Sequence, residues 1–386
     1  MVVAGEASGD LYGGFLVRAL REKAPGIRFS GIGGPRMAEE GVSLLADSRD
    51  LAVVGLVEVF SHFGAIRKAY RRAAEFLRDK RPDLLVLIDY PDFNLRLARE
   101  AQRWGVPVLY LVSPQVWAWR PSRVRQIVER VDRMLVIFPF EEKIYLEAGV
   151  PVEFVGHPLL DLLPPPPDRS QPRTRFGLDP GRPVVGLLPG SRKREIRFHL
   201  PTMLESGRLL LRRHPQLQFV LPLASTLRRG DLEPFLSKGS ARELGVRILE
   251  GEPGEVLSAV DVAVVKSGTA TLEAALMGVP MAVVYRTTPV TYLLALLLTR
   301  VRHVGLVNIV AGREIAPELV QGNFTPGRVA DVLDAFLREP ARAAAVSREM
   351  AALRERLGQP GCFMRAADAV LKMLGLTTTA EPARRT

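Results

Sequence analysis

The stretch Lys266-Ser-Gly-Thr-Ala-Thr-Leu-Glu-Ala-Ala-Leu-Met-Gly-Val-Pro280 decides the fold of this chain. It follows the apolar run Val260-Asp-Val-Ala-Val-Val265, which is short and β-branched enough to be a buried parallel strand. It ends in Gly278 and Pro280, which are the usual signals that stop a helix. The stretch therefore predicts a strand, a turn at residues 267–269 and a helix, which together form the βα unit of an α/β fold.

The same turn is a candidate anion site. Gly268 lets the backbone approach a ligand, and the first N–H groups of the following helix would point at that ligand. Glu273, about one turn into the helix, would face the same crevice and could accept hydrogen bonds from a diol. A site that binds a phosphate at the start of the helix and a ribose through the Glu273 carboxylate would suit a nucleotide sugar. An ordinary βα unit with a capped helix explains these residues equally well.

The composition is that of a folded protein with more than one core. At 386 residues the chain exceeds the usual size of a single hydrophobic core, so we expect two domains. The single cysteine, Cys362, excludes an internal disulfide and suits a reducing cytoplasm. The longest apolar run, about residues 290–298, is too short to span a bilayer, and we expect no signal peptide.

The charge balance calls for an anionic partner. The 53 basic and 42 acidic residues give a net charge of +11, which suits nucleic acid, an anionic membrane surface or phosphorylated substrates. The chain has no zinc-knuckle spacing and no aromatic-and-basic RNA-binding signature, so we expect no nucleic-acid partner. The five histidines never fall at i, i+4 or near the cysteine, so no metal site is indicated.

Strand-like apolar runs alternate with helix-like segments on both sides of a proline-rich stretch. The runs are about 1–4, 28–34, 84–88, 106–112 and 133–137, then 184–188, 218–222, 246–249, 260–265 and 281–285. Pro164 to Pro167 cannot propagate a helix or a ladder, so we predict a stiff extended linker over 164–175. The pattern predicts an α/β fold with Rossmann-like domains at 1–163 and 176–357, followed by a C-terminal helix and disordered tail at 358–386.

Polar side chains gather where the predicted strands end. In the second half, the turn Gly190-Ser191-Arg192 offers a second anion site, and the planar guanidinium of Arg192 suits bidentate contact with phosphate. The loops of the first half supply acids and an amide, namely Glu6, Asp10, Asp89, Asp92 and Gln115. A basic donor pocket and an acid-bearing acceptor pocket suit group transfer from a nucleotide donor to a hydroxyl. For each acid alone, a helix cap or a surface charge is the competing explanation.

Two aspartates stand close together in the loop after the strand at 84–88. Asp89 follows Ile88 directly, so we predict that it projects from the carboxyl edge of the sheet and acts as the base. Asp92 follows Pro91 and precedes a helix-like segment, so we predict that it is the N-cap of that helix.

The region 53–72 combines apolar residues with four basic ones, Arg67, Lys68, Arg71 and Arg72. One interpretation is a core helix with a solvated basic face. The other is an interfacial helix that lies on anionic lipid.

Seven stretches, in order from residue 4 to about 313, resemble those of the lipid-A-disaccharide synthase family, which are glycosyltransferases of the two-domain GT-B fold. The stretches are Ala4-Gly-Glu-Ala-Ser-Gly-Asp10, Ile88-Asp-Tyr-Pro-Asp-Phe-Asn94, Ser113-Pro-Gln-Val-Trp-Ala-Trp119, Gly156-His-Pro158, Leu187-Leu-Pro-Gly-Ser-Arg192, Ser267-Gly-Thr-Ala-Thr-Leu-Glu273 and Ala311-Gly-Arg313. The resemblance covers essentially the whole chain.

The resemblance implies an inverting transfer of 2,3-diacylglucosamine from UDP-2,3-diacylglucosamine to 2,3-diacylglucosamine 1-phosphate. The products would be the β-1,6-linked lipid A disaccharide 1-phosphate and UDP. Two Rossmann-like domains would face each other across a cleft, the N-terminal one serving the acceptor and the membrane and the C-terminal one the UDP-sugar. The C-terminal helix would pack back on the N-terminal domain. The enzyme would be cytoplasmic, peripheral to the anionic inner membrane and free of cofactors, and a homodimer stays open.

The resemblance also assigns roles to residues. Asp89 would be the general base, and Glu6 would be a catalytic residue on the acceptor side. The donor would contact Gly190, Ser191, Arg192, Ser267, Gly268, Thr269, Glu273 and Asn308, with Glu273 on the ribose. Asp10, Gln115 and Trp117 would line the acceptor side.

The chain departs from the family pattern at two places. The family usually has several more residues before Val3-Ala-Gly-Glu6, and it usually has Leu-Pro-Asn where this chain has Leu306-Val-Asn308. The alternatives are another GT-B enzyme, such as a UDP-N-acetylglucosamine 2-epimerase or a soluble-acceptor transferase, and a noncatalytic nucleotide-binding or membrane-docking module.

We predict metal-independent activity, because no acid pair or histidine cluster stands beside the phosphate turns in the sequence. Arg192 and the helix N–H groups would instead stabilise the leaving diphosphate. Turnover should be unchanged in excess EDTA. An enzyme that EDTA inactivates and that Mg²⁺ or Mn²⁺ restores would contradict this mechanism.

Overall fold

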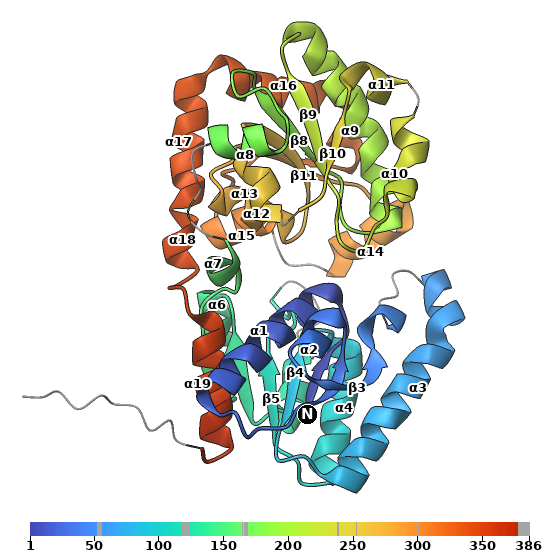
Figure 1. Ribbon diagram of the computed structural model, residues 1–386, viewed down its shortest axis with the longest axis vertical. Helices are drawn as coiled ribbons and strands as arrows, with labels where there is room; N and C mark the ends of the chain where they lie inside the picture. The colour runs from blue at the N-terminus through green and yellow to red at the C-terminus, as the bar shows by residue number, and fades with distance from the viewer. Residues whose placement is uncertain are drawn as a thin grey trace, which may run out of the picture. The chain divides into compact units, whose positions relative to one another are not determined.

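The computed structural model describes residues 1–51, 56–117, 123–163, 165, 169–237, 239–251, 253–298 and 302–376. The chain divides into two compact units, which are Met1–Asp161 with Leu357–Thr386, and Leu162–Arg356. Each unit is built around one parallel sheet flanked by helices (Figure 1). The predicted α/β class with two Rossmann-like domains is therefore confirmed.

The first unit holds a seven-stranded parallel sheet in the order β3-β2-β1-β4-β5-β6-β7. Its strands are β1 (Val2–Ala4), β2 (Ser30–Gly33), β3 (Ser43–Asp47), β4 (Leu85–Ile88), β5 (Val108–Leu111), β6 (Arg133–Val136) and β7 (Val152–Phe154). Its helices are α1 (Ala7–Lys23), α2 (Pro35–Glu39), the 3₁₀ turn η1 (Ser48–Asp50), α3 (Leu56–Lys80), α4 (Pro91–Arg103), α5 (Arg123–Arg130), α6 (Pro139–Glu147) and α19 (Cys362–Met373), with α7 (Leu159–Leu162) at the border of the units.

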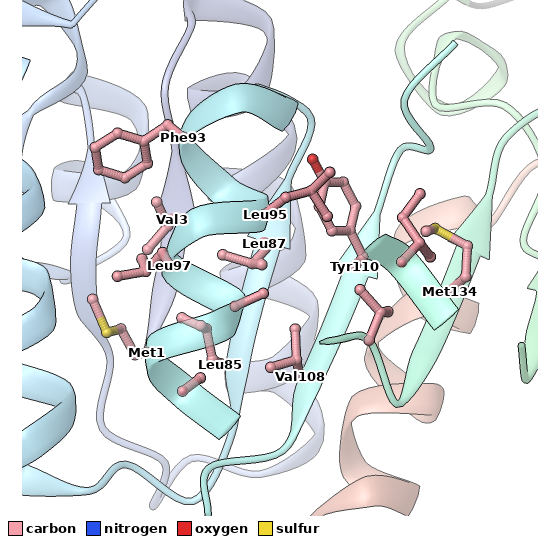
Figure 2. Close-up of a cluster of buried hydrophobic side chains, with 14 of the residues drawn as sticks. Met1, Val3, Leu85, Leu87, Phe93, Leu95, Leu97, Val108, Tyr110 and Met134 are labelled. Carbon is pink, nitrogen blue, oxygen red and sulfur yellow. The ribbon is translucent and has the colours of Figure 1, made fainter. Parts of the chain in front are cut away.

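The central strands are buried on both faces, which is why they read as continuous apolar runs. All residues of β4 and β5 are buried. Right-handed crossovers place α1 and α4 on opposite faces, because the chain leaves β1 and β4 in opposite directions. On the α4 face, a cluster of apolar side chains fills the space between helix and sheet (Figure 2). It includes Phe93, Leu95 and Leu97 of α4 and Leu85, Leu87, Val108 and Tyr110 of the sheet.

The C-terminal helix α19 packs on α1 of the first unit, as predicted. The ring of Phe363 stacks on Phe15 at 5.1 Å between ring centres and lies 6.0 Å from Tyr12. Asp161 accepts hydrogen bonds from the backbone N–H groups of Gly361 and Phe363, and so caps the start of this helix.

The second unit holds a six-stranded parallel sheet in the order β10-β9-β8-β11-β12-β13. Its strands are β8 (Val184–Leu188), β9 (Gln218–Pro222), β10 (Arg247–Leu249), β11 (Val262–Lys266), β12 (Met281–Tyr285) and β13 (Glu318–Val320). Its helices are α8 (Ser170–Arg175), α9 (Lys193–Arg213), α10 (Arg229–Leu236), α11 (Ser240–Leu244), α12 (Pro253–Ser258), α13 (Ala270–Leu276), α14 (Pro289–Leu298), α15 (Leu306–Ala311), the 3₁₀ turn η2 (Gln321–Asn323), α16 (Pro326–Arg338), α17 (Pro340–Ala351) and α18 (Leu353–Arg356).

The predicted extended linker is wrong in its second part. Residues 170–175 form α8, and the buried Arg173 pairs with Asp261 and donates to the carbonyl of Ala259. A salt bridge to a distant residue holds this segment against the second unit, and proline content gave no sign of it. The sequence also missed the edge strands β3, β7 and β13, which are short and only partly buried.

Helix α3 packs one face against the core of the first unit and exposes a basic face, which both interpretations of 53–72 allow. Ala69, Ala73 and Leu77 are buried in the core of the first unit. The basic residues of the opposite face are exposed, namely Arg67, Lys68, Arg71 and Arg72. Residues 52–55 and the side chains of 56–63 lie outside the described part of the chain. Among the helices that are described, none has the length and apolar character needed to cross a bilayer.

Candidate functional site

The first sheet has its topological switch point between β1 and β4. The two strands are neighbours, with Ala4 opposite Ile88, and the chain leaves them toward opposite edges of the sheet. In open α/β folds the crevice at such a point binds the ligand. Glu6 and Asp89 follow these two strands, so the fold brings them to the same crevice. The turns are also in contact, because a methyl carbon built on Gly5 would lie 2.1 Å from Cδ1 of Tyr90.

Asp89 lies in an uncommon backbone turn. Its φ is 47° and that of Tyr90 is 48°, so two successive non-glycine residues adopt the left-handed region. Two side chains hold the turn by donating to the Asp89 carbonyl, Asn94 Nδ2 at 2.6 Å and the Tyr110 hydroxyl at 2.5 Å. Such strain persists only where the surroundings fix it, and it concentrates at functional sites.

Tyr110 and Asn94 are supporting residues that the sequence analysis missed. Burial, and then the nearby Asp89 charge, raise the pKa of Tyr110 well above its usual value, so its hydroxyl stays protonated and can donate. Asn94 also donates to the Ile88 carbonyl at 3.2 Å. Its position in the stretch 88–94, five residues after Asp89, was the available signal.

Glu6 stands at the N-cap of α1, half-buried beside Tyr90. Burial, and then the charges of Glu6 and Asp92, raise the pKa of Tyr90. The Tyr90 ring therefore lies close to the carboxylates of both Glu6 and Asp92.

Asp10 was predicted on the acceptor side, but its buried carboxylate has a structural role. It is 4% exposed, and its carboxylate accepts from the backbone N–H groups of Gly34 at 2.6 Å, Arg36 at 3.1 Å and Met37 at 3.1 Å. It thus caps α2 from a neighbouring helix, a tertiary contact that sequence spacing does not reveal.

The N-cap prediction for Asp92 is wrong. Tyr90 is the N-cap of α4, and Asp92 lies in the first turn. The Asp92 carboxylate pairs with Arg123 at 2.5 Å, whose side chain is only 7% exposed. Asp92 therefore neutralises a buried guanidinium on α5.

Gln115 and Trp117, which we predicted on the acceptor side, differ in their surroundings. Gln115 is exposed, whereas the Trp117 indole N–H donates to Glu141 Oε1 at 3.0 Å. Burial outweighs the hydrogen bonds from Trp117 and the backbone and raises the pKa of Glu141 to about 7. Glu141, at 1% exposure, was not predicted, and it fixes the ring that the sequence assigned to the acceptor side.

The second sheet has its switch point between β8 and β11, where Leu188 pairs with Val265. The turn 190–192 follows β8 and the turn 267–269 follows β11, so the fold brings the two predicted phosphate turns together. Gly190 and Gly268 have φ values of 116° and 154°, which other residues rarely adopt. Ser267 donates from its hydroxyl to the Val304 carbonyl at 2.6 Å.

The helices after these turns differ in length. Arg192 is the N-cap of α9, which has 21 residues, whereas Thr269 precedes α13, which has seven. The helix dipole therefore favours an anion mainly at α9, and the 267–269 turn offers its backbone and the Thr269 side chain. Glu273 is half-buried in the first turn of α13, and its contact with the ribose stays a prediction.

Asn308 does not line the donor site as predicted. It is fully buried, and its amide Nδ2 donates to Ala316 O at 2.7 Å and to Glu318 Oε1 at 2.8 Å. Its Oδ1 accepts from the N–H groups of Ile315 at 2.8 Å and Ala316 at 3.0 Å. These four bonds occupy the amide, so Asn308 positions α15 and the start of β13.

The sequence analysis did not identify an ion pair that lies beside the two predicted phosphate turns. Lys266 ends β11 and lies 2.8 Å from Glu195 in the first turn of α9. Lys266 directly precedes Ser267, which was the available signal. The described residues contain no group of three or more His, Cys, Asp or Glu side chains that could hold a metal ion.

Comparison with known proteins connects these features to one family. A family model described as lipid-A-disaccharide synthetase matches residues 1–371. The lipid-A-disaccharide synthase of Geobacter sulfurreducens is 50% identical over 375 residues, 97% of each chain. That of Myxococcus xanthus is 45% identical over 374 residues, again 97% of each chain.

Solved structures resemble the chain in fold. A structure of S. aureus MnaA with UDP has a TM-score of 0.66 at 13% identity and covers 100% of this chain and 99% of its own. The UDP-GlcNAc 2-epimerase of Neisseria meningitidis bound to UDP-GlcNAc has a TM-score of 0.64 at 13% identity and covers 96% and 99%. At these identities the likeness shows the fold alone.

We expect Asp89→Ala to fold normally, because the hydrogen bonds that hold its turn go to its backbone carbonyl. It should lose turnover by about 10²–10⁴-fold, the usual share of a general base. Asp92→Ala should instead lower stability by about 1.5–3 kcal/mol, since Arg123 loses its charged acceptor, and should keep much of the rate per folded molecule. Thermal denaturation and single-turnover rates distinguish the two, and the reverse pattern would exchange their roles.

Proposed function

The chain belongs to the lipid-A-disaccharide synthetase family and is a glycosyltransferase of lipid A biosynthesis, and from this premise we propose its substrates and the roles of its residues. The donor is UDP-2,3-diacylglucosamine and the acceptor is 2,3-diacylglucosamine 1-phosphate. The products are the β-1,6-linked disaccharide 1-phosphate and UDP. No cofactor takes part.

One observation carries the proposal. The residues assigned to the donor lie at the switch point of the second sheet, and those assigned to the acceptor lie at the switch point of the first sheet. The second unit offers two glycine turns and Arg192 for the UDP-sugar, with Glu273 for the ribose. Structural relatives with UDP or a UDP-sugar bound share this fold and support a UDP-sugar donor. The first unit offers Asp89 and Glu6 for the acceptor.

In the proposed reaction Asp89 removes the proton from the 6-hydroxyl of the acceptor. The freed oxygen attacks C1 of the donor sugar from the face opposite the phosphate, so the configuration at C1 inverts. The bond between C1 and the phosphate oxygen breaks, and UDP leaves with the electron pair. Arg192 and the N–H groups at the start of α9 stabilise the charge that develops on the diphosphate.

The held turn at Asp89 suits the base role. A general base must keep its geometry while the proton moves, and Asn94 and Tyr110 fix the backbone that carries its carboxylate. Glu6 contributes negative charge beside the same crevice. We assign Gln115 and Trp117 to the acceptor side, with Trp117 held by Glu141.

Mass spectrometry of the products tests the function. The enzyme, incubated with UDP-2,3-diacylglucosamine and the acceptor, should yield the disaccharide phosphate and one UDP per disaccharide. Substrates without acyl chains serve as the control and should react poorly. Conversion of UDP-N-acetylglucosamine to its 2-epimer, or equal turnover of deacylated substrates, would instead indicate an epimerase or a soluble-acceptor transferase.

We further propose that the protein works in the cytoplasm, attached to the inner membrane from that side, because its acylated substrates reside in a bilayer. The exposed basic face of α3 supports this, with Arg67, Lys68, Arg71 and Arg72 along one side of the helix. Each such residue contributes about 1 kcal/mol near an anionic surface. The side chains of residues 53–63, whose apolar members we propose insert into the bilayer, lie outside the described part of the chain.

Liposome flotation tests the membrane proposal. The protein should float with anionic vesicles at low salt and much less at high salt, and replacement of the four basic residues of α3 by glutamine should reduce binding at least about 10-fold. A control variant changes four exposed arginines of the second unit to glutamine, Arg328, Arg338, Arg342 and Arg348. Equal losses in the two variants, or equal binding to neutral vesicles, would contradict a role for this face.

A further inference from the structure

The carboxylate of Glu195 lies between the two turns that we assign to the donor diphosphate. Its Oε2 accepts from the Ser191 N–H at 2.9 Å, and its Oε1 lies 2.8 Å from Lys266 Nζ. The Arg192 guanidinium is 4.0 Å from Oε1. A backbone N–H at a turn, an ammonium and a guanidinium are the groups that usually surround a bound phosphate.

The pair is shielded and charged. The side chains of Lys266 and Glu195 are 17% and 15% exposed. Burial raises the pKa of Glu195. The opposite effect is larger, because three groups stabilise the carboxylate: Lys266, the Ser191 N–H and Arg192. The pKa of Glu195 therefore lies below its usual value, and the carboxylate is ionised at neutral pH. The turns therefore already hold one negative charge.

Both glycine turns border this pair. A methyl carbon built on Gly190 would lie 2.3 Å from Glu195 Oε2, so a side chain at 190 would displace the carboxylate. A methyl carbon on Gly268 would lie 3.7 Å from Lys266 Nζ. The ion pair therefore lies next to both glycine turns.

We propose that Glu195 stands in for the donor diphosphate, and that Lys266 moves from Glu195 to the diphosphate when the UDP-sugar binds. This inference rests on the proposed function, because it takes a diphosphate as the ligand of these turns. The exchange needs only rotation of the flexible lysine stem. Glu195 then opposes donor binding by repulsion, whereas Lys266 favours it, so the two members of one ion pair have opposite effects on affinity.

Calorimetry with UDP tests this exchange, because the two variants should change the affinity for UDP in opposite directions. Lys266→Met should weaken UDP binding by about 10-fold or more, since a charged hydrogen bond to phosphate is lost. Glu195→Gln should tighten it by about 3- to 10-fold, because glutamine still accepts from the Ser191 N–H but carries no charge. A salt bridge that merely braces the two turns predicts weaker binding in both variants.

Two controls isolate the phosphate contribution. Lys193→Met removes the same charge from the same segment, but Lys193 is exposed and pairs with Asp231 at 2.7 Å, so UDP affinity should stay within about 2-fold of the unchanged protein. Uridine lacks the phosphates, and its affinity should be the same in all variants.

The outcomes separate this inference from the proposed function. If the unchanged protein does not bind UDP, the proposed donor site fails and the inference fails with it. If it binds UDP and Lys266→Met binds equally well, or Glu195→Gln binds more weakly, only the inference is overturned. Should thermal denaturation show that Lys266→Met is unfolded, Lys266→Gln and Glu195→Gln provide the same comparison.

Discussion

The parallel pairing of the central strands, β1 with β4 and β8 with β11, is the constraint on which the rest of the structure depends. In each pair the chain departs toward opposite edges of the sheet, so no crossover connection covers the carboxyl ends at that point. These strands are almost fully buried, so the hydrophobic effect contributes strongly to fixing their position. The positions of the polar turns that follow these strands are therefore determined by the apolar core.

That rigidity lets the first unit hold a strained turn. Two left-handed residues in succession, Asp89 and Tyr90, cost about 1–3 kcal/mol each. Burial of Ile88 at one end and the hydrogen bonds of Asn94 and Tyr110 offset this cost. Both bonds end on the carbonyl of Asp89, so Asn94 and Tyr110 hold the turn through its backbone.

The sequence predicted the buried strands and the turns after them, because apolar runs and glycines are local signals of buried strands and close backbone approach, but it missed the partly buried edge strands β3, β7 and β13. It failed where a side chain's partner is distant in sequence. Asp10 caps α2, which begins 25 residues later, and Asp92 pairs with Arg123 on another helix. Asn308 lies in a motif that suggested a ligand, yet its amide is occupied by residues 315–318. Glu141 was missed because a lone charged residue carries no periodic signal, and the role of Lys266 was missed because its partner, Glu195, lies 71 residues away in the sequence.

The buried carboxylates of this protein differ in what neutralises them, and that difference indicates which can exchange partners. Asp10 accepts only backbone N–H groups, and Glu318 is held by the N–H groups of Val304 and Gly305 together with the Asn308 amide. Releasing either would leave N–H groups buried without acceptors, at a cost of about 1–3 kcal/mol each. Glu195 accepts from the Ser191 N–H and lies near Arg192, but its nearest charged partner is Lys266, whose ammonium can reach another anion. A diphosphate at the same turns would replace the Glu195 carboxylate as the anionic partner of Lys266. Of these carboxylates, Glu195 is therefore the one suited to give up its partner.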